Sequence, residues 1–243
     1  MVKLMVSGYT DGGILGLPGK TGGKGIEVFS FEPENGALRL LSQNGGSENP
    51  SFLACTPQGV LAVCEQVGTC FLDGYRWTEG GRRLEKGAGV AVPGTAMCHV
   101  TVWPGGKYAS VSNYMTGDLA VIELADGWRP ARIAEHRQHT GVGYDQAFRQ
   151  EGPHIHSTLV SPGGAWLLAA DLGLDRIFVY RIDPKTGRLT DGDTQLRVPE
   201  GEGPRHMAFS PDGRFLYLVT EMGSRVFAFA WKETEGRASF LQA

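Results

Sequence analysis

The 243-residue sequence has few cysteines, no long apolar run and no strong charge of one sign. Its four cysteines form no CxxC pair, which argues against a zinc or thioredoxin-like motif and favours free thiols in a reducing compartment. No stretch approaches the ~20 apolar residues of a membrane-spanning helix, and the short apolar N-terminal run predicts a strand rather than a signal peptide. A net charge of -3 gives no electrostatic footprint for nucleic acid. We therefore expect a soluble, cytoplasmic protein that binds neither nucleic acid nor a membrane.

Helical periodicity is also missing, whereas glycine is abundant at 36 residues. Such a composition suits many short strands joined by tight turns. One turn motif recurs four times, as Pro57-Gln58-Gly59, Pro104-Gly105-Gly106, Pro162-Gly163-Gly164 and Pro211-Asp212-Gly213. Each motif lies between two short apolar stretches typical of strands, and further strand-like stretches follow. Four antiparallel strands in every ~40–50 residues predict the blade of a β-propeller.

We expect one all-β domain over residues 1–243, a β-propeller with units at about 1–46, 47–95, 96–150, 151–201 and 202–243. The first unit lacks the P-x-G turn and is expected to have three strands, whereas the others have four. The polar segment 129–152 makes the third unit long, so we expect a loop at the rim of a site. The segment from Gly13 to Thr21 resembles a phosphate loop, but a strand-like sequence follows it, which favours a rim loop instead.

Polar residues recur where each predicted hairpin brings the start of its first strand beside the end of its second. The starts carry Cys98, His99, His156, Arg205 and His206, and the ends carry Glu65, Asn113, Asp171 and Glu221. Inner strands of a propeller line its central channel, so we expect these groups at one channel mouth, with His156 beside Asp171 and Arg205 beside Glu221. His154 and His156 are two residues apart, so in a strand they face the same side. Alternatively, such residues hold blades together through buried hydrogen bonds, a role that suits His99 and Asp171 best.

Three stretches of the sequence resemble the propeller lactonase family: RQEGPHIHS at 149–157, ADLGLDRIFVY at 170–180 and GPRHMAFSPDGRFLYLVTE at 203–221. That family includes cycloisomerase-type 6-phosphogluconolactonases and carboxy-cis,cis-muconate lactonising enzymes. The resemblance implies that His154 or His156, with Arg205 and Glu221, forms the active site. It also implies seven blades with a further active-site arginine in the sixth. Because this chain matches five units, we expect it to be C-terminally truncated, with exposed end blades that promote self-association.

The leading hypothesis is hydrolysis of a sugar-acid lactone, 6-phosphogluconolactone in the pentose phosphate pathway, without cofactor or metal. Ester hydrolysis needs a base for water and positive charge for the oxyanion. The predicted catalytic residues are His156, Arg205 and Glu221, and the predicted substrate-binding residues are His154, His206, Asp171 and Asn113. Three alternatives stay open, namely a muconate-type lactonising enzyme, a non-catalytic binding platform and a calcium-dependent lactonase that uses side-chain oxygens as ligands.

Overall fold

The chain forms strands arranged in successive antiparallel sheets. The computed structural model describes residues 2–12, 22–66 and 69–243, and over these ranges it contains 19 strands and no helix. The segment from Gly13 to Thr21, expected to be a rim loop, lies outside the described residues. Within the same ranges there is accordingly no helix with the length and apolar character needed to cross a bilayer.

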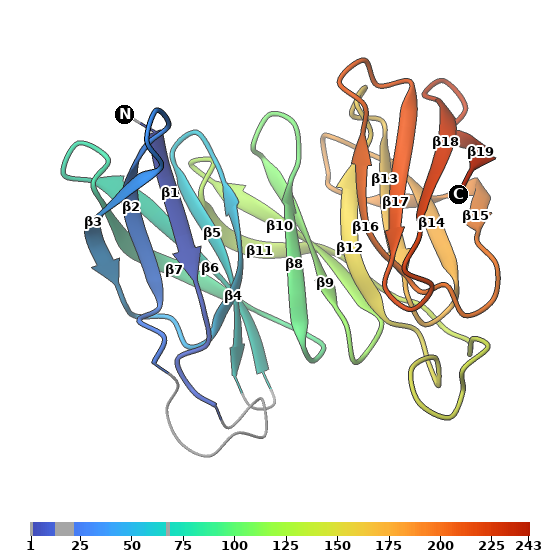
Figure 1. Cartoon of the computed structure of the whole chain (residues 1–243), viewed down its shortest axis with the longest axis horizontal. Helices are drawn as coiled ribbons and strands as arrows, with labels where there is room; N and C mark the ends of the chain where they lie inside the picture. The colour runs from blue at the N-terminus through green and yellow to red at the C-terminus, as the bar shows by residue number, and fades with distance from the viewer. Residues whose placement is uncertain (1, 13–21, 67–68) are drawn as a thin grey trace.

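The strands build five sheets, the first with three strands and the other four with four strands each, as predicted. The first sheet contains β1 (Val2–Ser7), β2 (Ile26–Glu32) and β3 (Ala37–Asn44), and the second contains β4 (Pro50–Cys55), β5 (Gly59–Gln66), β6 (Thr69–Thr78) and β7 (Arg83–Val92). The third contains β8 (Met97–Val102), β9 (Tyr108–Asn113), β10 (Asp118–Ala125) and β11 (Arg129–Gln138). The fourth contains β12 (Ile155–Val160), β13 (Trp166–Asp171), β14 (Arg176–Ile182) and β15 (Leu189–Arg197), and the fifth contains β16 (Pro204–Phe209), β17 (Phe215–Thr220), β18 (Val226–Lys232) and β19 (Arg237–Gln242). Strands pair in chain order in every sheet, which is the arrangement of propeller blades (Figure 1).

Each of the four P-x-G turns joins the first and second strands of a four-stranded sheet, as the repeat predicted. Three of the four turns contain a glycine with a positive φ angle, which most residues avoid, and only the turn with Gly59 does not. Gly164 and Gly213, for example, have φ angles of 74° and 70°, which glycine adopts without the steric cost of a Cβ atom. The recurring glycine therefore fixes the hairpin and, with it, the register of the two strands.

Neighbouring sheets pack face to face because their middle strands are apolar on both sides. Along β5, Leu61 and Val63 contribute to the core shared with the third sheet, while Val60 and Ala62 contribute to the core shared with the first. Side chains of a strand alternate between its two faces, so continuous apolar runs indicate strands covered on both sides. Such sandwiched strands hold the inner strands of successive sheets side by side.

The two end sheets have no neighbour on one face in this chain, and they lie at opposite ends of the arc in Figure 1. Large apolar side chains are exposed on both: Val2, Leu4, Val6, Leu38 and Leu40 on the first sheet, and Tyr217, Val219, Val226, Phe240 and Leu241 on the fifth. Exposed apolar surface of this kind favours association. The self-association expected from the sequence stays a prediction.

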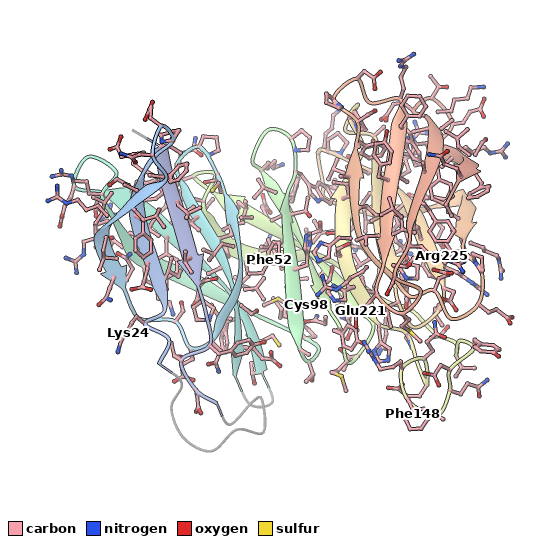
Figure 2. The ribbon with its side chains drawn as sticks, in the orientation of Figure 1. Lys24, Phe52, Cys98, Phe148, Glu221 and Arg225 are labelled. Carbon is pink, nitrogen blue, oxygen red and sulfur yellow. The ribbon has the colours of Figure 1, made fainter. Side chains whose placement is uncertain are left out.

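The expected loop over 129–152 is wrong in its first half. Residues Arg129–Gln138 form β11, the fourth strand of the third sheet, and its alternating charged side chains follow the exposed edge of that sheet. The connecting loop covers only residues 139–154. Phe148 is exposed in this loop, which projects from the sheets in Figure 2. The segment RPARIAEHRQ has few apolar residues, so its pattern does not predict a strand, although Ile133 and Ala134 pack against the core.

Candidate functional site

A cavity of about 630 Å³ opens where the inner strands of the sheets converge. The residues that line it come from all five sheets or the segments beside them: Tyr9, Ser51, Phe52, Glu65, Ala96, Met97, Cys98, Tyr114, Arg149, His156, Arg205, His206 and Glu221. Figure 2 shows Phe52, Cys98 and Glu221, from three different sheets, near the middle of the arc. The predicted catalytic residues His156, Arg205 and Glu221 thus share one cavity, as does His206.

A β-bulge at the start of each inner strand aims one side chain into this cavity. In β12, Ile155 pairs with Asp171 and Ser157 pairs with Ala170, which leaves His156 as the extra residue. The same irregularity occurs at the start of the other three inner strands and leaves one extra residue in each. These extra residues are Ser51, Cys98 and Arg205, and each lines the cavity. Bulges redirect side chains beside functional sites, and here one mechanism operates in four sheets.

A second position recurs in the four-stranded sheets and faces the cavity in three of them. It is the residue that comes directly after the last residue of the second strand paired with the inner strand. Its backbone N–H donates to the residue that precedes the inner strand, giving the pairs Glu65–Asn49, Tyr114–Ala96, Leu172–His154 and Glu221–Gly203. Glu65, Tyr114 and Glu221 line the cavity, whereas Leu172 is fully buried. The repeat therefore places a bulge residue and a strand-end residue side by side in each sheet.

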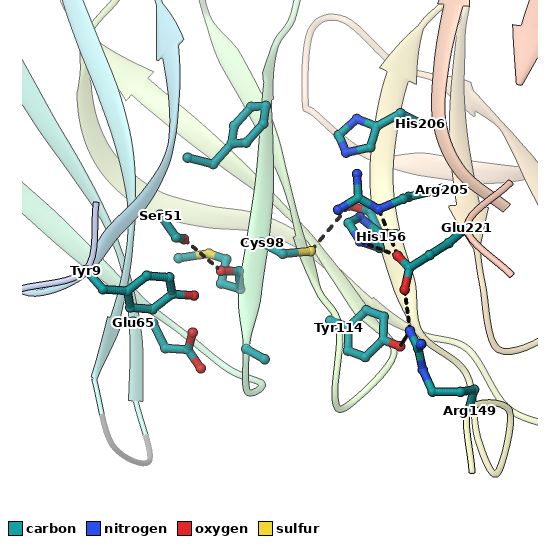
Figure 3. A pocket seen from close by; sticks show the side chains of 13 residues that line it. Tyr9, Ser51, Glu65, Cys98, Tyr114, Arg149, His156, Arg205, His206 and Glu221 are labelled. Atoms are coloured by element: carbon teal, nitrogen blue, oxygen red, sulfur yellow. Dashed lines mark hydrogen bonds and ion pairs between the residues drawn. The ribbon is translucent and has the colours of Figure 1, made fainter. Parts of the chain in front are cut away.

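Glu221 is the centre of the charged network in the cavity (Figure 3). Arg205 donates from Nε to Glu221 Oε2 at 2.8 Å, and Arg149 donates from Nη2 to Glu221 Oε1. Arg149 also donates to the Tyr114 hydroxyl at 3.0 Å. His156 Nε2 lies 3.5 Å from Glu221 Oε2. One carboxylate thus holds two guanidinium groups and contacts an imidazole.

The environment of Glu221 keeps it ionised. Burial by itself would raise the pKa of this carboxyl, but hydrogen bonds from Arg149 and Arg205 outweigh burial and hold the pKa below its usual value. Burial, with a contribution from the positive charge of Arg205, lowers the pKa of His156 to about 4. At neutral pH the site therefore presents a carboxylate, two guanidinium groups and a neutral imidazole.

Aromatic rings close the inner end of the cavity around the axis of the arc. The ring centroids of Phe52 and His99 are 4.6 Å apart, those of His99 and His206 are 5.3 Å apart, and those of His156 and His206 are also 5.3 Å apart. Burial, with a contribution from Arg205, lowers the pKa of His206. These rings come from four different sheets, so their contacts hold the inner strands of those sheets together.

Three of the predicted binding residues lie outside the cavity lining, which corrects the sequence-based interpretation. Asp171 is fully buried and accepts from the backbone N–H groups of His154 and Leu174, while its other oxygen lies 2.6 Å from His139 Nδ1. Asn113 is fully buried and donates to the carbonyl oxygen of Pro93. Asn113 directly precedes Tyr114, and Asp171 directly precedes Leu172. A step of one residue along a strand turns the side chain to the opposite face.

His154 also lies outside the cavity lining. It precedes β12, so the rule that residues two apart share a face does not relate it to His156. Its ring is buried, lies against Tyr114 with centroids 4.5 Å apart, and bonds through Nδ1 to the Tyr114 carbonyl oxygen. Of the two histidines in the GPHIHS stretch, only His156 lines the cavity.

The placement of Asp171 and Asn113 also weakens the calcium alternative, which needed four oxygen-bearing side chains around one axis. Only Glu65 and Glu221 of that set line the cavity. In the described part of the chain, no group of three or more His, Cys, Asp and Glu residues could hold a metal ion. The four cysteines are free thiols, as expected.

Sequence reasoning missed four polar residues of the wall: Tyr9, Ser51, Tyr114 and Arg149. Tyr114 follows Asn113 directly and was hidden by the error of one residue in the strand-end position. Arg149 lies in the RQEGPHIHS stretch, yet nothing in its spacing indicates that the loop folds back toward Glu221. Buried Gln150 anchors the loop there, since its side chain donates to the Leu172 carbonyl oxygen and accepts from the backbone of Asp145.

We expect the protein to lose stability on mild acidification because two histidines are held neutral. Burial lowers the pKa of His99 to about 3, with smaller contributions from His206 and His156, and the pKa of His156 is lowered to about 4. An unfolded histidine has a pKa of about 6.5, so between these values the unfolded chain binds more protons. The free energy of unfolding should fall below about pH 6.5, by about 1.4 kcal/mol per pH unit for each histidine. Denaturant unfolding of wild type and His99→Gln at about pH 7, 6 and 5 tests this, and the variant should show a shallower pH slope. Equal slopes would contradict it.

Comparisons with known proteins agree with this architecture. The family model described as "Lactonase, 7-bladed beta-propeller" matches residues 3–243. A 6-phosphogluconolactonase of Bacillus subtilis (strain 168) is 28% identical over 233 residues, which cover 95% of this chain. The crystal structure of a putative 6-phosphogluconolactonase from Bacteroides fragilis NCTC 9343 has a TM-score of 0.88 at 28% identity, covering 99% of this chain and 66% of that one. The periplasmic gluconolactonase of Pseudomonas aeruginosa has a TM-score of 0.87 at 30% identity, covering 99% and 67%.

The present chain spans 65% of the length of the Bacillus subtilis relative. The match nevertheless runs through all five sheets and includes every cavity residue described above. The family resemblance inferred from the sequence is confirmed, and the chain belongs to the lactonase family of seven-bladed β-propellers.

Proposed function

We propose that the protein hydrolyses the lactone of a phosphorylated sugar acid, with 6-phosphogluconolactone as substrate and 6-phosphogluconate as product. The observation that carries this proposal is the network in which Glu221 binds Arg149 and Arg205 beside His156 in one open cavity. The names of the Bacillus subtilis and Bacteroides fragilis relatives support the choice of substrate.

His156 is the proposed general base. A neutral imidazole accepts a proton from the water that attacks the lactone carbonyl, and Glu221, 3.5 Å away, stabilises the imidazolium that forms. The carboxylate stays ionised, as in catalytic His–Asp pairs, but here it faces Nε2. Because Nδ1 is buried with no hydrogen-bond partner among the described residues, Nε2 is also the nitrogen that would take the proton. The network of Glu221 with the two arginines keeps that carboxylate charged.

Arg205 and Arg149 supply the positive charge that the reaction and the substrate need. Arg205 uses Nε for Glu221, and both arginine side chains are 43% exposed, so their remaining N–H groups are available to a bound anion. A guanidinium donates two parallel hydrogen bonds to a carboxylate, a phosphate or a developing oxyanion. The two arginines thus suit a substrate that carries a phosphate and develops an oxyanion on the same side of the cavity.

A muconate-type lactonising reaction is the second enzymatic candidate, because the same acid and base groups would run the ring closure in the reverse direction. A non-catalytic binding platform would use the cavity without turnover. The proposed location is the cytoplasm, although the related Pseudomonas aeruginosa gluconolactonase is named periplasmic.

The test follows proton release from 6-phosphogluconolactone against its spontaneous hydrolysis, with wild type and Arg205→Lys. Wild type should accelerate ring opening. Lysine keeps the charge but loses the planar fork of donors, so kcat/KM should fall about tenfold, close to the loss of one charged hydrogen bond. Absence of turnover by wild type would refute the lactonase proposal and leave the binding platform, and unchanged kinetics in Arg205→Lys would refute the role of Arg205.

A further inference from the structure

The cavity has a second polar wall that the proposed chemistry does not use. Glu65 and Ser51 of the second sheet occupy the same two repeat positions as Glu221 and Arg205 of the fifth sheet. In Figure 3 they lie with Tyr9 on one side of Cys98, whereas Arg205 and Glu221 lie on the other. We call the side with Arg205, Arg149 and Glu221 the arginine wall and the side with Tyr9, Ser51 and Glu65 the second wall. The two walls have the same backbone geometry and different chemistry.

Hydrogen bonds organise this second wall. Tyr9, Glu65 and Ser51 line the same side of the cavity, where Tyr9 and Glu65 interact electrostatically, and the Ser51 hydroxyl donates to the Met97 carbonyl oxygen at 3.5 Å. Buried Asn49 fixes the segment that follows Tyr9, because its Oδ1 accepts from the backbone N–H groups of Thr10 and Asp11 at 2.9 and 2.8 Å. The amide nitrogen of Asn49 donates to the Glu65 carbonyl oxygen at 3.0 Å. One side chain thus holds Tyr9 and Glu65 together across two sheets.

The second wall differs from the arginine wall in that none of its described residues is a cation. Both guanidinium groups that line the described cavity bind Glu221, and the titratable groups that face Glu65 are Tyr9, Cys70 and Cys98. Burial raises the pKa of Glu65 and also that of Tyr9. A carboxyl, a phenol and a hydroxyl supply no positive charge of their own to a phosphate. They both donate and accept hydrogen bonds, which is what alcohol groups require.

We propose that Glu65, Tyr9 and Ser51 form a hydroxyl-binding subsite that takes the polyhydroxylated part of the substrate while its anionic group lies on the arginine wall. The inference rests on the proposed function in that it assigns the two ends of a sugar-acid ligand to the two walls. It defines the substrate class as anionic polyols with hydroxyl groups distant from the phosphate. A site built to bind hydroxyl groups discriminates strongly against ligands that lack them, because its buried polar groups are then left unpaired.

The test measures binding by calorimetry of three stable probes, 6-phosphogluconate, gluconate and inorganic phosphate, to wild type, Glu65→Gln and Tyr9→Phe. Each variant should bind 6-phosphogluconate about tenfold more weakly, the loss expected for about 1.4 kcal/mol of hydrogen bonding. Affinity for inorganic phosphate should not change, because phosphate reaches only the arginine wall. Glu34→Gln, an exposed glutamate in the turn between β2 and β3, is the matched control and should bind all three probes as wild type does.

The outcomes separate the subsite from the proposed reaction. If wild type opens no lactone yet the two variants lose affinity for the polyols alone, the subsite stands and the lactonase proposal fails. Unchanged affinity for 6-phosphogluconate in both variants would overturn the subsite, whatever the turnover. An equal loss for all three probes, or no binding of any probe by wild type, would also overturn it.

Discussion

Replacing Glu221 with glutamine is expected to lower kcat/KM for 6-phosphogluconolactone by about a hundredfold to a thousandfold, the range found when a preorganised electrostatic group is removed. Glu221 contacts Arg205, Arg149 and His156 at once, with both oxygens occupied. The amide of glutamine can accept only through its oxygen, and its NH₂ group would face a donor. One arginine is then released, and the imidazolium formed at His156 loses its compensating charge.

The change should appear mainly in kcat, because the base is weakened in the transition state while one arginine remains for the substrate anion. The matched control is Glu235→Gln, which removes an exposed carboxylate between β18 and β19 of the same sheet and should leave kcat/KM unchanged. Wild-type kinetics in Glu221→Gln would remove Glu221 from the mechanism.

Replacing Asp171 with alanine is expected to reduce the free energy of unfolding by about 3 to 5 kcal/mol, because each buried group left without its hydrogen-bond partner costs about 1–3 kcal/mol. Asp171 is fully buried and binds the His154 and Leu174 backbone N–H groups together with the His139 ring. The variant would leave these donors unpaired in the interior. Denaturant unfolding measures the loss, and the residual folded protein should keep its KM, because Asp171 lies outside the cavity lining.

Asp191→Ala is the control for this measurement. Asp191 lies in the same sheet, but its side chain is 77% exposed, and its ion pair with Arg137 is at the surface. Exposed pairs contribute ~0–1 kcal/mol, so the control should unfold almost as wild type does. A raised KM with little loss of stability in Asp171→Ala would show that Asp171 binds substrate, as predicted from the sequence.

Asn113 and Asp171 lie outside the cavity because of the register of the second strand in their sheets. Pairing places Asn113 and Asp171 opposite the starts of their inner strands, whereas Glu65 and Glu221 are one residue further along. The sequence alone shows all four as polar residues near a strand end, and it cannot distinguish the two faces without the register. The β-bulges add a second offset, since they turn His156 and Arg205 into the cavity regardless of simple alternation.

Most of the strands, the turns and the family follow from local patterns in the sequence, such as Pro162-Gly163-Gly164 followed by an apolar run, whereas β11 does not. The sequence also identified His156, Arg205 and Glu221, which lie at the starts and ends of such runs. Only the folded chain brings Arg149 to Glu221 and Tyr9 beside Glu65, and only the folded chain places His156 in the cavity lining and His154 outside it. These contacts depend on register and on loops that cross between sheets, and no periodic signal in the sequence records either of them.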